Sequence, residues 1–231
     1  MFEIVTLSKF PDIFQQFLRS ANTYEPDTQK LAVLDSEMYD TYAKLTPLSW
    51  TGIRGINPFI FARNANMGIR AAGNNDVVLV NDDVSFCRKD SLKDLERAAY
   101  ASSKIGLISP VISGVVGNMY QRVKCPGRSN GISISPKRLA FVCVYIKRST
   151  IDEIGLLDEQ FDGYGGDDDD YCYRAEQAGF KLAVTTDVQV RHGFGYCPSS
   201  TSFSRTMGDT SVSMMEMKKK FIAKHKVLPR Y

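Results

Sequence analysis

Residues 76–83 read DVVLVNDD, an apolar run that ends in an amide and two carboxylates. The continuous hydrophobicity of residues 76–80 predicts a strand that is covered on both faces. Just upstream, residues 66–72 predict a helix that ends at Gly73. Alternation of helices and strands is typical of α/β sheets, which bind ligands at the carboxyl ends of their strands. The polar end of this segment is therefore where a site is first expected.

The same alternation extends along the chain in both directions. Toward the N-terminus, we predict strands at residues 2–7, 30–35 and 59–62 and a helix at 11–21. Toward the C-terminus, we predict helices at 91–103, 149–155 and 214–226, strands at 106–112, 138–147, 181–185 and 187–191, and a helix that follows the acidic run 167–170 and stops at Gly179. These elements predict one α/β domain over residues 1–231, with a mostly parallel central sheet flanked by helices.

Composition restricts the class of protein. The chain has 231 residues, of which 43% are hydrophobic and 24% charged, as in ordinary globular proteins, so disordered and collagen-like classes are excluded. The 29 basic and 26 acidic residues give a formal net charge of +3, which by itself does not indicate nucleic-acid binding.

Localisation and redox state can also be predicted. The longest apolar run, residues 139–146, is far below the ~20 residues that a membrane-spanning helix needs. The N-terminus lacks the pattern of a secretory signal, so we expect a cytoplasmic protein that begins at Met1. Its 5 cysteines include no CxxC pair, which predicts free and mostly buried thiols.

The paired carboxylates of residues 80–84 (VNDDV) allow two interpretations. Adjacent carboxylates at the end of a buried strand repel each other, and a divalent cation or ribose hydroxyls would relieve that repulsion. An acidic turn is an equally good interpretation, because Asn and Asp are favoured in tight turns.

The second acidic segment, residues 162–170, reads DGYGGDDDD. Carboxylates in a first helical turn are stabilised by the helix dipole, and Asp170 can pair with Arg174. That structural role leaves the glycines unexplained. They suit a sharp bend that a ligand can approach, and one carboxylate there could act as a general base. An EF-hand is excluded, because its sixth-position Gly and twelfth-position Glu are missing in any frame.

The two histidines and the C-terminal lysines are less specific. His192 ends a strand before a Ser/Thr/Gly-rich loop, 193–209, and is either structural or a metal ligand; the loop itself suits a lid over a bound ligand. His225 is expected to be solvated. In the final helix we expect the lysines to face solvent, with contact to anionic lipid or nucleic acid as the weaker alternative. Its apolar residues, Met214, Met217, Phe221 and Ile222, are expected to pack on the core.

Three segments, in order, resemble glycosyltransferases of the GT-A fold, family 2 type, over nearly the whole chain. They are ARNANMGIRAAGNNDVVLVNDDVSF (62–86), IDEIGLLDEQFDGYGGDDDDYCYRAEQAGF (151–180) and VRHG (190–193). Residues 163–174 are also similar to the GWGGEDDD-type block of animal β-1,4-galactosyltransferases. The resemblance implies a nucleotide-diphospho-sugar transferase fold, with a nucleotide-binding half in residues 1–83 and an acceptor-binding half in 84–231.

The resemblance also implies a function and a set of roles. It implies metal-dependent, inverting transfer of a sugar from a nucleotide sugar, most simply a UDP-sugar, to a glycan or other hydroxyl acceptor, with Mn²⁺ or Mg²⁺ as cofactor. Asp83 and His192 would bind the metal, and Asp168 would be the general base. Asp167 takes the place of the family's Glu in a Glu-Asp pair and is one methylene shorter. The implied donor-binding residues are Thr6, Ser8, Asp35, Asn66, Arg70, Asp82 and Asp83, and the implied acceptor-binding residues are Gly165, Gly166 and Asp169.

The chemistry of these residues agrees with the implied roles. A departing diphosphate needs a hard cation held by carboxylate and imidazole, and an attacking hydroxyl needs a carboxylate base. Two other functions stay open. A catalytically silent sugar- or nucleotide-binding module would bind UDP and Mn²⁺ without turnover. A nucleotidyltransferase would normally carry a Gly-rich, basic loop after the first strand, where this chain has LSKFPD (7–12). The sugar, the acceptor and the oligomeric state are not predicted.

Overall fold

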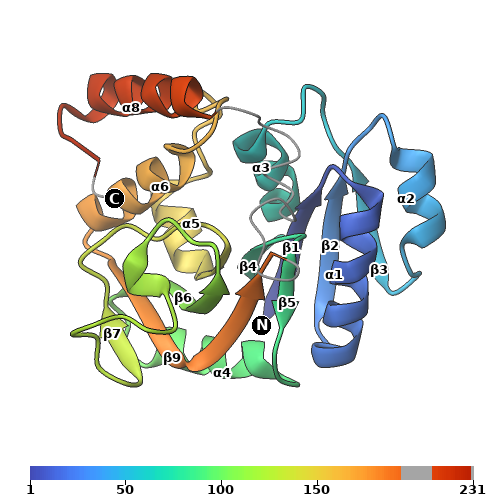
Figure 1. The fold of residues 1–231 in the computed structure, drawn as a ribbon, viewed down its shortest axis with the longest axis horizontal. Coiled ribbons are helices and arrows are strands. Elements are labelled where there is room, and N and C mark those ends of the chain that lie inside the picture. Colours follow the sequence, from blue (N-terminus) through green and yellow to red (C-terminus); the bar gives the residue numbers. More distant parts are fainter. Residues whose placement is uncertain (194–209, 230–231) are drawn as a thin grey trace.

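The computed structural model describes residues 1–193 and 210–229. Its strands are β1 Phe2–Ser8, β2 Gln29–Leu34, β3 Trp50–Arg54, β4 Asp76–Asn81, β5 Val84–Phe86, β6 Ile105–Gly114, β7 Ile132–Ile134, β8 Cys143–Ile146 and β9 Lys181–His192. Its helices are α1 Pro11–Tyr24, α2 Tyr39–Leu45, α3 Phe61–Ala71, α4 Ser91–Tyr100, the 3₁₀ helix η1 Met119–Gln121, α5 Arg148–Ile154, α6 Asp167–Gln177 and α8 Ser211–His225. Figure 1 shows their arrangement.

The nine strands form one sheet in the order β3-β2-β1-β4-β8-β6-β9-β5, with β7 paired to β9. Strands β3, β2, β1 and β4 pair in parallel. Strand β8 is antiparallel to both β4 and β6, and β6 is parallel to β9. Six of the nine strands therefore run in one direction, which confirms the predicted mostly parallel sheet.

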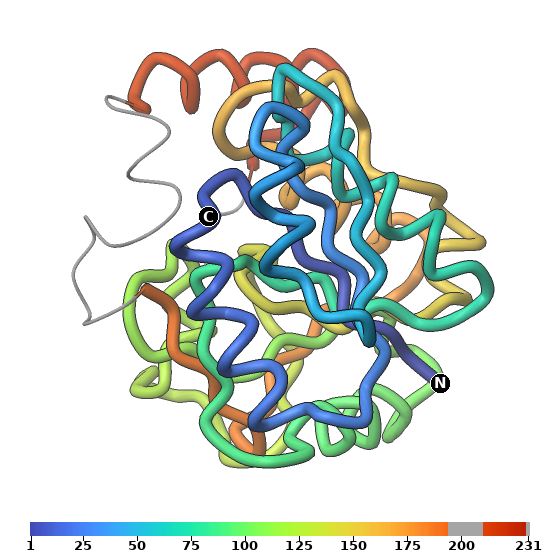
Figure 2. The backbone as a smooth tube through the Cα atoms, turned by 90° about the vertical axis from the view of Figure 1, so that its right-hand side faces the viewer, coloured from blue at the N-terminus to red at the C-terminus, as the bar shows by residue number. Residues whose placement is uncertain are grey.

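Helices cover both faces of the sheet. On one face, α1 and α4 contribute Phe14, Phe17 and Leu95 to a buried cluster. On the other, α3, α5 and α6 contribute Ile69, Ile151 and Tyr171 to a second buried cluster. Helix α8 lies outside these layers, over α6, in both Figure 1 and the perpendicular view of Figure 2. This confirms the predicted single-domain α/β architecture.

The strand predicted at residues 59–62 is wrong. Residues 61–71 form α3, and the third strand of the parallel set is β3 at Trp50–Arg54. The run FIFA starts a helical face that continues through Ala65 and Ile69, both buried. A short apolar run does not distinguish a strand from the start of a buried helix, which explains the error. The helix predicted at 66–72 thus begins earlier, and Gly73 follows its end with φ of 58°.

The C-terminal half differs in strand lengths. The strand predicted at 138–147 is only β8, Cys143–Ile146, and the two strands predicted at 181–185 and 187–191 form the single strand β9. The ladder between β6 and β9 shifts register between Pro110 and Val111. Proline has no N–H to donate to the ladder, which is a physical reason for an irregularity at this position.

Helix α8 and the cysteines partly match expectation. Met217 and Phe221 are buried as predicted, but Met214 is 42% exposed, so its predicted packing on the core is wrong. Four cysteines are free: Cys143 and Cys172 are buried, Cys87 is exposed and Cys125 half-buried. Cys197 and the lid predicted for the 193–209 loop fall outside the described residues from position 194 on. In the described part of the chain, every helix is too short or too polar to span a membrane.

Candidate active site

The adjacent ends of β1 and β4 hold the first predicted carboxylate. Leu7 pairs with Asn81 in the parallel ladder, so Ser8 and Asp82 follow at the same edge. The Ser8 hydroxyl donates to Asp82 Oδ2 at 2.5 Å, and the Tyr42 hydroxyl lies 3.1 Å from Ser8 Oγ. Asp82 is only 2% exposed. A hydrogen bond to a carboxylate is among the stronger ones, so Ser8 fixes the orientation of Asp82.

Asp83 and His192 are brought together by the antiparallel pairing of β5 with β9. Val84 pairs with His192 in this ladder, and Asp83 Oδ1 lies 3.2 Å from His192 Nε2. His192 Nδ1 contacts the Val115 carbonyl. As an N–H donor to that carbonyl, Nδ1 directs the Nε2 atom toward Asp83. The histidine is therefore oriented by a backbone carbonyl of the loop that follows β6.

The surroundings of His192 restrict its freedom further. A Cβ on Gly114 would lie 2.1 Å from the His192 carbonyl oxygen, so only glycine fits beside it. Burial lowers the pKa of His192, but the hydrogen bond and the charge of Asp83 outweigh burial and leave the pKa above its ordinary value. The buried imidazole and carboxylate thus stabilise each other in one geometry.

Asp83 and His192 could supply two ligands of a metal ion whose other ligands come from a bound molecule. In residues 1–193 and 210–229, no group of three or more His, Cys, Asp or Glu side chains could hold a metal by itself. Carboxylate oxygen and imidazole nitrogen are ligands that Mn²⁺ accepts, while Mg²⁺ prefers oxygen and often shares its shell with phosphate and water. The two side chains therefore suit a cation whose coordination is completed by phosphate oxygens.

A cavity opens beside the ends of β1 and β2. The Asp35 N–H donates to the Ser8 carbonyl at 2.9 Å, and Asp35 Oδ1 accepts from the Glu37 N–H at 2.9 Å. The cavity has a volume of about 530 Å³ and is lined by Lys9, Phe10, Pro11, Asp12, Asp35, Glu37, Met38 and Thr41. Only Asp35 was predicted from the sequence. The other lining residues also follow predicted strands, which was the available signal.

Thr6 and Asn66, which were also predicted to bind the donor, do not line this cavity. Thr6 is fully buried within β1, and its hydroxyl has no hydrogen-bond partner among the described residues. The Asn66 amide is occupied, because it donates to the Leu157 carbonyl and to Glu159 Oε1 and accepts from the Leu157 N–H, each at 2.9 Å.

Arg70 lies near the opposite end of β4. The Arg148 side chain donates to the carbonyl of the preceding residue, Ile69, at 3.5 Å, and the Arg148 N–H donates to Asp76 at the start of β4. The Arg70 side chain is 59% exposed and 4.0 Å from Glu159. The structure therefore does not bring Arg70 to the edge that carries Asp83.

The glycines before α6 form the predicted sharp bend. Gly165 and Gly166 have φ of 78° and 89°, a region that favours glycine. A Cβ on Gly166 would lie 2.8 Å from the Phe161 ring, and one on Gly163 would lie 2.5 Å from Ser213 Oγ of α8. A Cβ on Gly165 would meet open space. At Gly163 and Gly166 the space that was predicted for a ligand is therefore filled by the protein's own side chains.

Three carboxyl groups at the start of α6 have raised pKa values. Burial, then the charge of Asp168, raise the pKa of Asp167 to about 8 and that of Asp169 to about 7. Burial also raises the pKa of Asp168, against the effect of backbone N–H donors that include Asp169 at 2.8 Å and Phe141. Asp167 and Asp169 are buried, whereas Asp168 is half-buried. Asp168 is therefore the most accessible of the three.

The segment at residues 141–142 connects the two acidic regions. The Asn81 N–H donates to the Val142 carbonyl at 3.0 Å, and the Phe141 N–H donates to the Asp168 carboxylate. The end of β4 and the start of α6 therefore flank one short piece of backbone. The Asp168 carboxylate therefore lies on the side of the 141–142 backbone near the end of β4, which Asp82 and Asp83 follow.

Asp170 has a different surrounding from the three residues before it. It is fully buried, and its predicted ion pair with Arg174 is confirmed at 2.8 Å. The predicted solvation of His225 is wrong, because its side chain is 9% exposed and Nε2 lies 2.7 Å from Asp170 Oδ1. No local sequence pattern indicates this contact, since the two residues belong to different helices far apart in the chain.

The chain has the GT-A glycosyltransferase fold. It is similar to GalNAc-T7, solved with UDP, GalNAc and Mn²⁺, at a TM-score of 0.68 and 15% identity, over 99% of this chain and 55% of that one. It is also similar to residues 1–349 of S. aureus TarS, at a TM-score of 0.57 and 13% identity, over 97% of this chain and 71% of that one. The chain thus spans about half the length of the GalNAc-T7 chain. No protein-family model and no curated protein matches it by sequence.

Proposed function

We propose that this protein is a metal-dependent, inverting glycosyltransferase that moves a sugar from a nucleotide sugar to an acceptor hydroxyl. The observations that carry the proposal are the contact between Asp83, which follows β4, and His192, which ends β9, and the 141–142 backbone that bonds both the end of β4 and the Asp168 carboxylate, in a GT-A fold. The UDP and Mn²⁺ in the GalNAc-T7 structure support a UDP-sugar as donor and Mn²⁺, with Mg²⁺ as the alternative, as cofactor.

Residues 1–83 form the donor half of the proposed site. Asp83 and His192 hold the cation, which when bound neutralises negative charge on the departing diphosphate. Asp82, oriented by Ser8, faces the ribose or the cation. The cavity beside Asp35 accepts the nucleoside base, and its volume of about 530 Å³ is in the range of small-ligand sites.

Residues 84–231 form the acceptor half, with Asp168 as the general base. Its carboxylate takes the proton of the acceptor hydroxyl as that oxygen bonds to the anomeric carbon. The bond from the anomeric carbon to the diphosphate oxygen breaks, and the electron pair leaves with the nucleoside diphosphate. Attack from the face opposite the leaving group inverts the configuration. Asp167, Asp169, Gly166 and Gly165, beside which a Cβ would meet open space, border the acceptor.

The raised pKa of Asp168 suits this role. A base is most effective when its pKa lies near the working pH, and burial moves the pKa of Asp168 upward in that direction. Asp167, Asp168 and Asp169 lie so close together that ionisation of one disfavours ionisation of the others. The charge of Asp168 thus contributes to the raised pKa of Asp167 and of Asp169.

A panel of UDP-sugars, each with Mn²⁺, Mg²⁺ or a chelator, tests the proposal by donor hydrolysis and by nucleotide binding. We expect hydrolysis of at least one donor, with loss of activity in chelator. Binding of UDP and Mn²⁺ without hydrolysis of any donor would favour a silent binding module. Absence of binding in every metal condition would contradict the proposal.

A further inference from the structure

Helix α8 is joined to the start of α6 through one buried carboxylate. Asp170 Oδ1 accepts from Lys224 Nζ at 2.6 Å and from His225 Nε2 at 2.7 Å, both on α8. Asp170 Oδ2 accepts from Arg174 Nε at 2.8 Å, within α6. A fully buried carboxylate needs such partners, because a buried charge without them is strongly destabilising. The position of α6 and the position of α8 are therefore coupled at Asp170.

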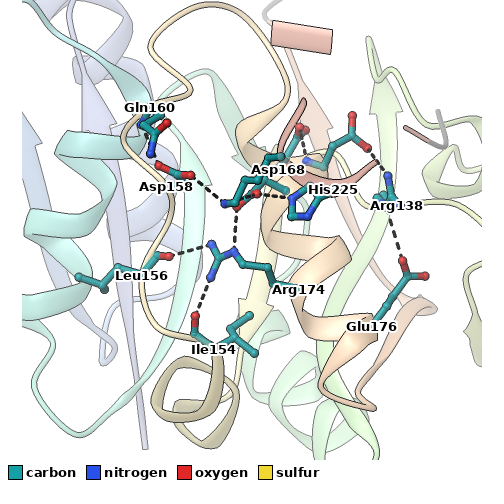
Figure 3. A network of polar contacts seen from close by, with 12 residues as sticks. Arg138, Ile154, Leu156, Asp158, Gln160, Asp168, Arg174, Glu176 and His225 are labelled. Atoms are coloured by element: carbon teal, nitrogen blue, oxygen red, sulfur yellow. Dashed lines mark hydrogen bonds and ion pairs between the residues drawn. The ribbon is translucent and has the colours of Figure 1, made fainter. Parts of the chain in front are cut away.

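The α6 side of this cluster is fixed independently of α8. Arg174 also donates to the Ile154 carbonyl at 2.6 Å and to the Leu156 carbonyl at 2.8 Å (Figure 3). Its guanidinium is thus held by the end of α5 and the segment that follows it. Lys224 and His225, by contrast, are partners of Asp170 that belong to α8.

The same face of α8 holds the segment that leads into α6. Lys224 also donates to Asp158 at 2.7 Å, and Lys220 donates to Asp162 at 2.5 Å and to the Gln160 carbonyl at 2.8 Å. Nearer the bend, Ser213 Oγ accepts from the Tyr164 N–H at 2.8 Å. Helix α8 therefore contacts the chain from residue 158 to the first turn of α6, on both sides of the glycine bend.

Ring packing reinforces these polar contacts. The His225 ring lies 4.4 Å from the Tyr173 ring and 4.7 Å from the Phe221 ring, measured between centroids. The Arg138 guanidinium lies 4.9 Å from the Tyr173 ring and from the Phe221 ring, and its Nη1 atom is 3.9 Å from Asp169 Oδ1. The packing of α8 on α6 therefore extends to Asp169, the neighbour of Asp168.

We propose that Lys224 and His225 are positioning residues for the general base. Through Asp170 they hold the first turn of α6, so that the Asp168 carboxylate points at the acceptor hydroxyl; this inference rests on the proposed function. Asp168 and Asp170 share one helical turn, so a tilt or fraying of that turn displaces both. A misplacement of about 1 Å in a reacting group can cost about 100-fold in rate.

The kinetic test uses the variants Lys224→Met and His225→Phe, and the UDP-sugar that the wild type hydrolyses fastest with Mn²⁺. His225→Phe keeps the ring packing and removes only the contact with Asp170. We expect kcat for donor hydrolysis to fall about tenfold in each variant while KM for the donor stays within about twofold, because the donor residues lie on other elements. Lys224→Arg, which keeps the charge, should restore most of kcat.

Two controls separate positioning from general destabilisation. Lys219→Met removes an exposed lysine of the same helix and should leave kcat unchanged. Leu95→Ala lowers stability from α4, on the other face of the sheet, and should leave kcat unchanged at temperatures well below its Tm. A loss of kcat in Leu95→Ala equal to that in Lys224→Met, at matched Tm, would overturn the positioning role.

Amide hydrogen exchange gives a readout that needs no substrate. We expect the amides of residues 163–170 to exchange at least tenfold faster in Lys224→Met than in the wild type. Equal exchange in both proteins, or unchanged kcat in Lys224→Met with an active wild type, overturns this inference and leaves the proposed function standing. A wild type that hydrolyses no donor contradicts the proposed function, and exchange then decides by itself whether α8 holds the segment.

Discussion

The proposed donor edge and the turn that carries Asp168, here called the base-bearing turn after its proposed role, are built in different ways. At the donor edge, the ladders β1–β4 and β5–β9 put Ser8 beside Asp82 and Asp83 beside His192. The turn that carries Asp168 also contacts α8, a helix far along the chain, through Lys224 and His225 on Asp170. Strand register thus fixes one region, and helix docking fixes the other. Substitutions should separate the two regions, with effects on nucleotide binding for the first and on stability and turnover for the second.

The largest expected effect on stability is at Asp170. Replacing Asp170 by Ala removes the fully buried carboxylate that Arg174, Lys224 and His225 share. Removing one partner of a buried ionic cluster costs about 3–5 kcal/mol. We expect a loss of unfolding free energy of that size in urea titrations. A loss below about 1 kcal/mol would show that α8 contributes little to holding this region.

The largest expected effect on binding is at Asp83. Asp83→Asn keeps the shape of the side chain but removes the charge that faces His192 at 3.2 Å. We expect the affinity for UDP in the presence of Mn²⁺ to fall about 100-fold, with little change in UDP affinity in chelator. Isothermal titration calorimetry measures both. Equal losses with Mn²⁺ and with chelator would contradict a role of Asp83 in metal binding.

A pH dependence of stability should come from the base-bearing turn. The pKa of Asp167 is raised to about 8 in the folded protein, so folding favours the protonated form. Its contribution to stability is complete below the unfolded pKa of about 4 and is lost as pH rises through about 8. We expect Tm to fall between pH 5 and pH 8.5 less in Asp167→Asn than in the wild type. A fall of the same size in both would contradict the raised pKa.

The smallest expected effect is at Ser213. Ser213→Ala removes the acceptor for the Tyr164 N–H, a single neutral hydrogen bond. We expect a loss of about 1 kcal/mol in unfolding free energy, with nucleotide binding unchanged. Weaker binding of Mn²⁺ and UDP in this variant would show that the two regions are coupled more tightly than their contacts indicate.

The same contrast explains what the sequence predicted. The strand ends at Ser8, Asp35 and Asp83 were predictable, because residues after parallel strands meet at one edge. The bend at Gly165 and Gly166 was predictable from the glycines themselves. The docking of α8 was not, because His225 and Lys224 have no local pattern that names Asp170 as their partner.

The errors have physical reasons as well. The run at 59–62 was assigned to a strand because four apolar residues fit both a strand and the start of a buried helix. The donor role of Arg70 was implied by the resemblance and not by the strand pattern, and residue 70 lies in the last turn of α3, beside the start of β4.

The central claim is that Asp168 acts as base at a site where the donor binds independently. Asp168→Asn keeps the size of the side chain and removes its ability to take a proton. The direct measurement is donor hydrolysis together with the binding of UDP and Mn²⁺ in this variant. The account predicts a fall in kcat of about 10²–10⁴-fold with nucleotide affinity within about threefold of the wild type. Full hydrolytic activity in Asp168→Asn would contradict it.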